Sequence, residues 1–201
     1  MRSRFLPEGR LLHTPENEAA CASRDGLRRA MEEETVLEGV AQLCDGAHNL
    51  LVSVGPFTGF LPREEAALGI AEGTTREIAI LSRVGKPVCF QITALEESEG
   101  VLRPRLSRRR AQQAALDAML AGLHPGCILP AVVTHLESFG AFVDIGCGVP
   151  SLIGIENISV SRIPHPDQRF RVGQAIFAVV QELDPKLGRV YLTHRELLGT
   201  W

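Results

Sequence analysis

The sequence has none of the features that mark a membrane or secreted protein. No apolar run in its 201 residues approaches the roughly 20 residues of a membrane-spanning helix. The N-terminus carries basic residues, but no apolar segment follows them as it would in a signal peptide. No low-complexity stretch indicates disorder, and the 45% of hydrophobic residues suffice for folded cores. We therefore expect a cytoplasmic protein of one or two domains that makes no membrane contact.

The residue patterns of common catalytic, metal and nucleotide sites are also absent. The five cysteines form no Cys-x-x-Cys pair, which predicts scattered thiols in a reducing cytosol. No Gly-x-x-x-x-Gly-Lys-Ser/Thr loop for phosphates occurs, and no His-Glu-x-x-His pair for zinc. Ser138 and Ser159 have no evident His and Asp partners that would make them nucleophiles. The sequence thus predicts no enzyme, no metal site and no cofactor.

The most informative stretch runs from Glu137 to Ile145, where two phenylalanines precede alternating residues. On a regular strand Val143 would face the core and Phe142 the solvent. Gly140 permits a bulge or turn that could bring Phe139 to the same surface as Phe142. Exposed aromatic rings on a sheet are a platform for flat ligands, of which single-stranded bases are the commonest. Because phenylalanines in short strands more often belong to a core, spacing alone leaves both interpretations open.

The motifs around this stretch follow one another in a recognisable order. They are Pro125-Gly126, Phe139-Gly140-Ala141-Phe142-Val143-Asp144, Ser151-Leu152-Ile153-Gly154-Ile155, Val172-Gly173-Gln174, Leu183-Asp184-Pro185 and Gly188-Arg189-Val190-Tyr191-Leu192-Thr193. In order and spacing, residues 126–195 resemble the S1 RNA-binding domain, the repeat of the large ribosomal protein of the small subunit. The resemblance implies a five-stranded barrel of the OB type. One departure is Gly154, which stands where the family usually has a histidine, so one expected base or sugar contact is missing.

The resemblance also implies a binding site for single-stranded RNA that works by stacking and charge. Phe139 and Phe142 would stack on bases, a contact that contributes about 1–3 kcal/mol per base. Arg189 would contact a phosphate or stack its guanidinium on a base. Asp184 could accept a hydrogen bond from a base edge or orient Arg189.

Further residues are candidates for contact with the RNA. Lys186, Arg195 and Arg171 could line the path of the RNA backbone. His165, in a proline-containing loop, could contact a nucleotide or have no role in binding. The predicted RNA-binding residues are therefore Phe139, Phe142, Gly154, His165, Asp184, Lys186, Arg189 and Arg195.

A second, weaker copy of the same domain precedes residues 126–195 in the chain. Positions 36 and 59 of this copy correspond to positions 128 and 151, and Gly-Lys and Leu-Ser pairs follow in the matching places. His48 and Leu51 stand where the second copy has Phe139 and Phe142, so the stacking pair is lost. Glu96 and Arg103 stand where the second copy has Asp184 and Arg189, so an acid and an arginine occupy these positions in both copies. Gly-Phe-Leu-Pro at 59–62 resembles the leading repeats of the ribosomal protein, which often dock on protein partners.

We therefore predict a mainly β chain with two tandem five-stranded OB-type barrels, a linker helix and an N-terminal helix. Pro15 to Met31 is expected to be helical, with Thr14 as N-cap and a possible interruption at Asp25-Gly26. Strong helix formers between the copies predict the linker helix, which would end near Gly122. The predicted segments are a helical 1–34, a first barrel at 35–107, a linker at 108–124, a second barrel at 125–198 and the start of a truncated continuation at 199–201.

A basic cluster in and before the linker comprises arginines 103, 105, 108, 109 and 110. These side chains could pair with nearby acids on a solvated face, or contact an RNA backbone. The net charge of −3 argues against indiscriminate coating of DNA, but a local basic groove would still suffice for RNA.

Two classes of function remain open. The first is a module that holds single-stranded RNA, namely messenger RNA in ribosome-associated translation, on the second barrel. The second is a protein–protein adaptor on the ribosome or an RNA-degradation assembly, with the first copy docked on protein. An accessory part of an RNA-processing enzyme is a third interpretation. Exposed phenylalanines on a basic face would favour the first class, and an exposed apolar patch on residues 36–107 the second. In either case we expect a monomer.

Overall fold

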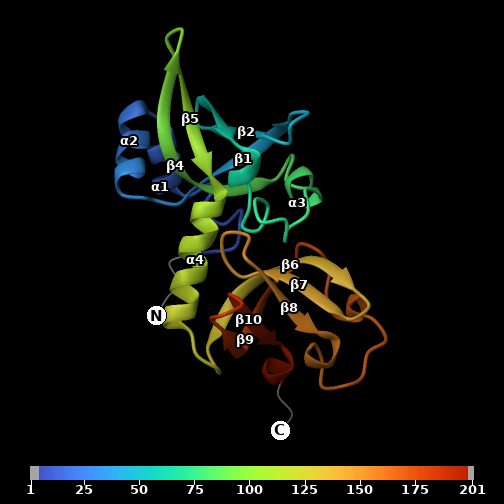
Figure 1. Cartoon of the computed structure of the whole chain (residues 1–201). Helices are drawn as coiled ribbons and strands as arrows, with labels where there is room; N and C mark the ends of the chain where they lie inside the picture. The colour runs from blue at the N-terminus through green and yellow to red at the C-terminus, as the bar shows by residue number, and fades with distance from the viewer. Residues whose placement is uncertain (1–4, 199–201) are drawn as a thin grey trace. The chain divides into compact units, whose positions relative to one another are not determined.

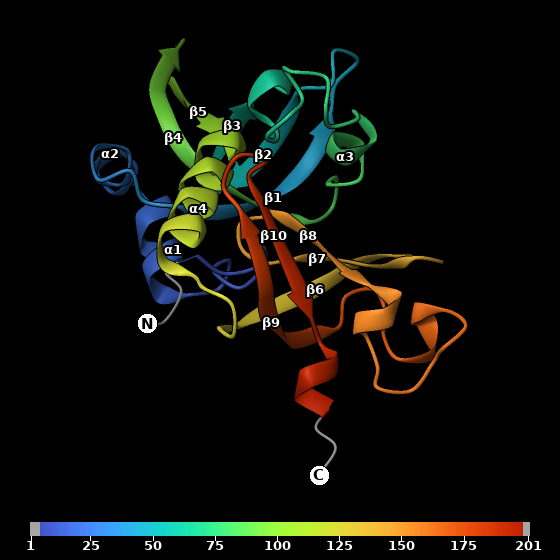
Figure 2. The same cartoon turned by 60° about the horizontal axis from the view of Figure 1, so that its bottom comes forward.

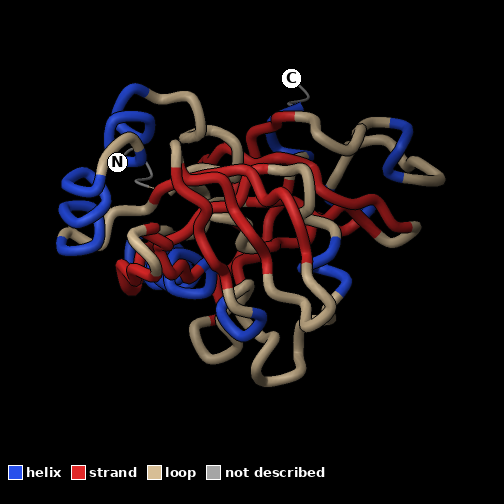
Figure 3. Tube along the Cα trace, turned by 90° about the horizontal axis from the view of Figure 1, so that it is seen from above, coloured by secondary structure: helices blue, strands red, loops and turns tan. Residues whose placement is uncertain are grey.

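The computed structural model describes residues 5–198 and divides into two compact units (Figure 1). The first unit comprises residues 8–114, and the second comprises the chain from residue 115 onward with the N-terminal residues up to Pro7. Strands are the dominant regular structure in each unit, and most helices are short (Figure 3). The prediction of a mainly β chain with two five-stranded sheets is confirmed. Within residues 5–198, no helix has both the length and the apolarity to span a membrane.

The first unit is a closed barrel with strand order β1-β2-β3-β5-β4. Its strands are β1 (Leu37–Cys44), β2 (Leu50–Val54), β3 (Phe57–Leu61), β4 (Pro87–Ser98) and β5 (Val101–Ser107). A short 3-10 helix η1 (Arg63–Glu65) and the helix α3 (Ile78–Leu81) follow β3. Inward-facing side chains of alternate strand residues, among them Val52, Phe90 and Leu106, are fully buried and form the core.

Two helices precede the first barrel, α1 (Pro15–Cys21) and α2 (Arg24–Glu32). Thr14 caps α1 by accepting a hydrogen bond from the Asn17 N–H, and Pro15 occupies the first helical turn. The single helix expected over residues 15–31 is divided, and the break lies before Asp25-Gly26. Ser23 starts the second helix, because its hydroxyl accepts from the Gly26 N–H at 3.1 Å.

The second unit contains a five-stranded sheet with order β10-β9-β6-β7-β8 (Figure 2). Its strands are β6 (Ile128–Glu137), β7 (Gly140–Asp144), β8 (Pro150–Gly154), β9 (Ala175–Asp184) and β10 (Arg189–Thr193), with short 3-10 helices η2 (Ile155–Asn157), η3 (Pro166–Gln168) and η4 (Arg195–Leu198). The two edge strands, β8 and β10, contact each other, and the Ser151 hydroxyl donates to the Val190 carbonyl. The sheet is thereby rolled up around a buried apolar interior.

The two sheets repeat the same register. In the first barrel Leu43 lies opposite Leu51, and Leu51 lies opposite Phe60. In the second sheet the same pairing joins residues 135 and 142, and then 142 and 152. An irregularity interrupts β1 between residues 41 and 43, and β6 has one between residues 133 and 135. The register therefore shows which positions of the two copies are equivalent.

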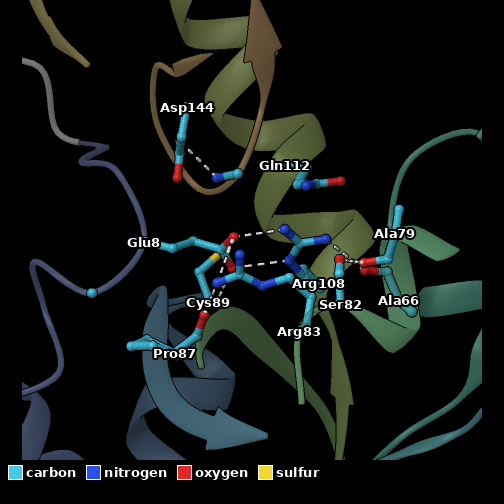
Figure 4. Close-up of polar contacts among 12 residues, drawn as sticks. Glu8, Ala66, Ala79, Ser82, Arg83, Pro87, Cys89, Arg108, Gln112 and Asp144 are labelled. Atoms are coloured by element: carbon cyan, nitrogen blue, oxygen red, sulfur yellow. Dashed lines mark hydrogen bonds and ion pairs between the residues drawn. The ribbon is translucent and has the colours of Figure 1, made fainter. Parts of the chain in front are cut away.

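The helix α4 (Arg108–Gly122) begins directly after β5, and its first residue is held by a buried ion pair (Figure 4). The guanidinium of Arg108 donates twice to the carboxylate of Glu8, at 2.9 and 2.6 Å, and once to the Ala66 carbonyl. Arg83 approaches the same carboxylate at 3.6 Å, and the Cys89 N–H donates to it. Burial alone would raise the pKa of Glu8, but Arg108 and Arg83 outweigh it and hold that pKa below its ordinary value.

Three arginines of the basic cluster pair with acidic side chains. Arg109 donates two hydrogen bonds to Glu65, at 3.1 and 3.0 Å. Arg105 lies 3.7 Å from the Glu96 carboxylate. The sequence left open whether the cluster pairs with acids or contacts RNA, and for Arg105, Arg108 and Arg109 the structure shows pairing with acids.

Candidate nucleic-acid interface

Three rings gather on the β6–β7 hairpin. Phe139 is 53% exposed, and Phe142 is half-buried. Their ring centroids lie 6.0 Å apart with the planes at 89°, an edge-to-face arrangement. His135 lies beside Phe142 with centroids 6.1 Å apart and planes only 30° from parallel. We call His135, Phe139 and Phe142 the aromatic cluster.

The local sequence explains why these rings meet. Glu137 and Gly140 are paired across the hairpin, so only Ser138 and Phe139 form the turn. Position 140 requires a glycine because the backbone of β8 lies close to it: a Cβ at this position would meet the Ile153 carbonyl oxygen at 2.4 Å. Val143 is fully buried in the core as expected, but Ala141 and Asp144 are buried as well, so of the residues of β7 Phe142 alone is half-buried. The glycine thus brings Phe139 next to Phe142 through a tight turn rather than through a bulge.

The outer face of the sheet continues from the aromatic cluster across the next strands. Phe142 lies opposite His135 on one side and opposite Leu152 on the other. Beyond β8 lies β10, where Tyr191 alternates with the buried residues Val190 and Leu192 and is half-buried itself. The row formed by His135, Phe142 and Leu152 is therefore apolar and aromatic.

Gly154 and Arg195 lie at the same end of the sheet as Phe139. Gly154 is paired with Gly140, and the Ile155 N–H donates to the Phe139 carbonyl at 2.9 Å. Next to this point is a groove of about 540 Å³. It is lined by Ile155, Glu156, Ser159, Val160, Ser161, Arg162, Ile163, Pro164 and Arg195. A groove that carries two arginines and one glutamate therefore begins where the aromatic cluster ends.

Asp184, Lys186 and Arg189 form a second group at the β9–β10 turn. The Asp184 carboxylate accepts from the Lys186 and Leu187 N–H groups, both at 3.1 Å, so it shapes the turn. Asp184 and Arg189 are paired in the ladder, but no ion pair joins them among the described residues. Arg189 begins β10 and Arg195 follows its end, so the strand separates the two groups.

Residues 123–195 match the S1 RNA binding domain family. The resemblance seen in the sequence is thereby confirmed for this segment, which contains the aromatic cluster and both groups of basic residues. Among the described residues, no cluster of His, Cys, Asp or Glu could hold a metal ion.

The similarity to known proteins extends beyond residues 123–195. The chain is 28% identical over 177 residues to small ribosomal subunit protein bS1 of Neisseria meningitidis serogroup B, covering 85% of this chain and 29% of that protein. It is 26% identical over 183 residues to bS1 of Staphylococcus haemolyticus, covering 89% and 44%. Protein tex of Bordetella pertussis is 37% identical over 113 residues, covering 56% and 14%. The chain thus spans less than half the length of these curated relatives.

His165 of the S1 domain has a local structural role. It caps η3, because its Nδ1 accepts a hydrogen bond from the Asp167 N–H at 3.1 Å, and the Asp167 carboxylate lies 3.2 Å from the same nitrogen. An RNA contact of His165 stays a prediction beside these local contacts.

The equivalent face of the first barrel lacks the aromatic cluster. His48 lies in the β1–β2 turn with a left-handed backbone (φ 65°) and forms an ion pair with Glu77. Leu51 replaces the central ring, and its neighbour Phe60 lies under the guanidinium of Arg105 at 5.5 Å. Arg105 rather than Arg103 makes the ion pair with Glu96. The expected acid–arginine pair is thus shifted by two residues along β5.

His135, the third ring of the cluster, is not among the residues predicted from the sequence. A usable signal was present: a turn of two residues at 138–139 places residue 135 opposite residue 142 by simple counting across an antiparallel hairpin. Only the position of the turn had to be known, and the glycine at 140 marks it.

Proposed function

We propose that the second sheet binds single-stranded RNA through the outer face that carries the aromatic cluster. The observation that carries the proposal is the pair of accessible rings, Phe139 and Phe142, in contact on the hairpin of an S1 domain. Such rings stack on bases whatever the sequence, and each stacked base contributes about 1–3 kcal/mol. We expect weak sequence preference for the same reason.

Basic residues on either side of the rings would hold the RNA backbone. Arg162 and Arg195 line the groove next to Phe139, and both are exposed. Lys186 and Arg189 are exposed at the β9–β10 turn. In this proposal the groove takes the phosphates that follow the stacked bases, and the turn takes phosphates at the other end of β10. At Gly154, where the family usually supplies an imidazole, the Glu156 carboxylate lies close to the position that a side chain would take.

The names of the bS1 relatives suggest the setting. They are proteins of the small ribosomal subunit, and we propose a related role for this chain in holding messenger RNA during translation in the cytoplasm. We propose no catalytic activity and no cofactor, and we expect the protein to act as a monomer.

A second candidate function concerns the first barrel. Several large apolar side chains of this unit are exposed, namely Leu43, Ile78, Leu81 and Val84. Exposed apolar residues without an aromatic pair fit protein docking better than RNA binding. We propose that the first barrel serves as an adaptor to a ribosomal or RNA-associated protein while the second sheet holds RNA.

The test is an RNA titration of the full chain and two variants, followed by fluorescence anisotropy. Phe139→Ala should weaken binding of single-stranded RNA by about 1–3 kcal/mol, because it removes one stacking ring. The matched control is His48→Ala, at the equivalent turn of the first barrel, which should leave the affinity unchanged. Thermal melts should show that both variants remain folded, since Phe139 is largely exposed. Unchanged affinity in Phe139→Ala would refute the proposal.

Full-length variants are preferable to halves of the chain. A cut between residues 107 and 108 would separate Glu8 from Arg108, whose ion pair is buried. A loss of RNA binding in such a fragment could then result from unfolding rather than from a missing ring.

A further inference from the structure

A third ring extends the platform in a direction that the resemblance does not indicate. His135 belongs to β6, whereas the family's usual histidine position, Gly154, belongs to β8. Since β7 lies between these two strands, the two positions flank Phe142 on opposite sides. We propose that His135 is a further RNA-contacting residue, and that the binding face extends over β6 instead of over the Gly154 side of β8. The proposal rests on the RNA-binding function proposed above.

The geometry of the rings carries the inference. The imidazole of His135 is within 30° of parallel to the ring of Phe142, at a centroid distance of 6.1 Å, so the two rings are stacked. Phe139, by contrast, is turned by 89° to Phe142. A base that binds at Phe142 on the β6 side would therefore meet a second aromatic ring. The side chain of His135 is 60% exposed and accessible to such a base.

A neighbouring carboxylate fixes the orientation of this imidazole. Nε2 of His135 lies 2.6 Å from Oε1 of Glu137, two residues further along β6. Successive odd residues of a strand share one face, so Glu137 holds the ring from the same side of the sheet. A side chain fixed before binding loses less conformational freedom when a base packs on it. Glu137 is therefore a positioning residue for His135.

The first barrel provides an internal comparison. The register places Leu43 at the position of His135, and Leu43 is 54% exposed. An exposed leucine is thus compatible with this strand position, and His135→Leu should not disturb the fold. The substitution removes the flat aromatic face while it retains an apolar side chain. His135→Phe keeps an aromatic ring and removes only the polar atoms.

The experiment measures the affinity of the full chain for oligoadenylates of increasing length by fluorescence anisotropy. His135→Leu should weaken binding to long oligomers about five- to tenfold, near the lower end of a single stacked base. The His135→Leu variant should also reach its full affinity at a shorter oligomer length than the unsubstituted protein does. His135→Phe should retain both the affinity and the length dependence. Glu137→Gln should weaken binding less than His135→Leu, because the ring is still present but less firmly held.

The outcomes separate this inference from the proposed function. If Phe139→Ala weakens binding and His135→Leu does not, the RNA-binding function stands and the role of His135 is overturned. If His135→Phe loses as much affinity as His135→Leu, stacking on residue 135 is refuted. If neither Phe139→Ala nor His135→Leu changes the affinity, the proposed function itself fails. Thermal melts of each variant establish that the compared proteins are folded.

Discussion

Replacing Glu8 by alanine should destabilise the first unit far more than replacing any exposed acid. The Glu8 side chain is 2% exposed, and Arg108, its partner, is 7% exposed. Arg83, at 3.6 Å from the same carboxylate, is 19% exposed. Removal of Glu8 would take away the carboxylate that one buried and one mostly buried guanidinium face. The loss of one partner of a buried pair costs about 3–5 kcal/mol, most of it because the remaining charge stays desolvated.

A matched pair on the next residue of α4 provides the control. Glu65 accepts two hydrogen bonds from Arg109, at 3.1 and 3.0 Å, in the same forked geometry. These two side chains are 29% and 35% exposed, so solvent screens their attraction. Glu65→Ala should therefore cost about 1 kcal/mol or less. Each variant removes a forked arginine contact and one further hydrogen bond, from the Cys89 N–H to Glu8 or from the Ser107 hydroxyl to Glu65, and the two ion pairs differ in burial.

Differential scanning calorimetry of the full chain measures both effects. For a unit of this size, 1 kcal/mol corresponds to a shift in melting temperature of at least about 4 °C, so Glu8→Ala should lower the melting temperature of the first unit by about 12 °C or more. Glu65→Ala should lower it by about 8 °C or less. Equal shifts in the two variants would refute the reasoning, because burial would then have no bearing on the strength of these pairs.

Three further predictions concern pH, sequence and salt. Burial raises the pKa of Glu38 to about 7 from 4.5, so the folded state binds the proton more tightly and loses stability as the pH rises. Relative to Glu38→Gln, the free energy of unfolding should therefore fall by about 3 kcal/mol between pH 4.5 and 7, as urea denaturation at several pH values can measure; a constant difference would contradict the assignment. Gly154→His should strengthen RNA binding several-fold in anisotropy titrations, because a Cβ there meets only the movable carboxylate of Glu156; a loss of affinity would mean that the hairpin cannot accept a side chain. The logarithm of RNA affinity should fall with the logarithm of salt by about 0.7 per phosphate contacted, and salt-independent binding would exclude the basic residues as contacts.

Local patterns were sufficient to predict much of the second sheet. The strand pattern correctly placed Val143 in the core, at 0% exposure. The Phe-Gly pair marked the hairpin turn, although the reason for the glycine is the nearby Ile153 carbonyl rather than a bulge. These features depend on residues that are close in sequence or directly opposite on a neighbouring strand, and such relations follow from strand geometry.

Features that depend on distant residues could not be predicted in the same way. Arg108 is paired with a carboxylate 100 residues earlier, and Arg109 with one 44 residues earlier, so nothing near the linker indicated that these charges are neutralised. The local sequence did not reveal that His165 caps a short helix, because η3 itself is made by a loop whose course depends on packing. The segment 199–201, expected to start a continuation, lies outside the described residues. The predicted RNA contacts stay predictions until they are measured.

The buried ion pair between Glu8 and Arg108 also affects the order of events during synthesis. The partner of Glu8 is added to the growing chain 100 residues later than Glu8, after the last strand of the first barrel. A nascent chain that has completed β5 but not yet released α4 from the ribosome holds a carboxylate whose main counter-charge is missing. Because burial without Arg108 is costly, the N-terminal segment should close onto the barrel only when the first turn of α4 emerges. Co-translational folding of the first unit is thus completed by the linker helix, and a ribosome stalled before Arg108 would carry a barrel with its N-terminal segment still open.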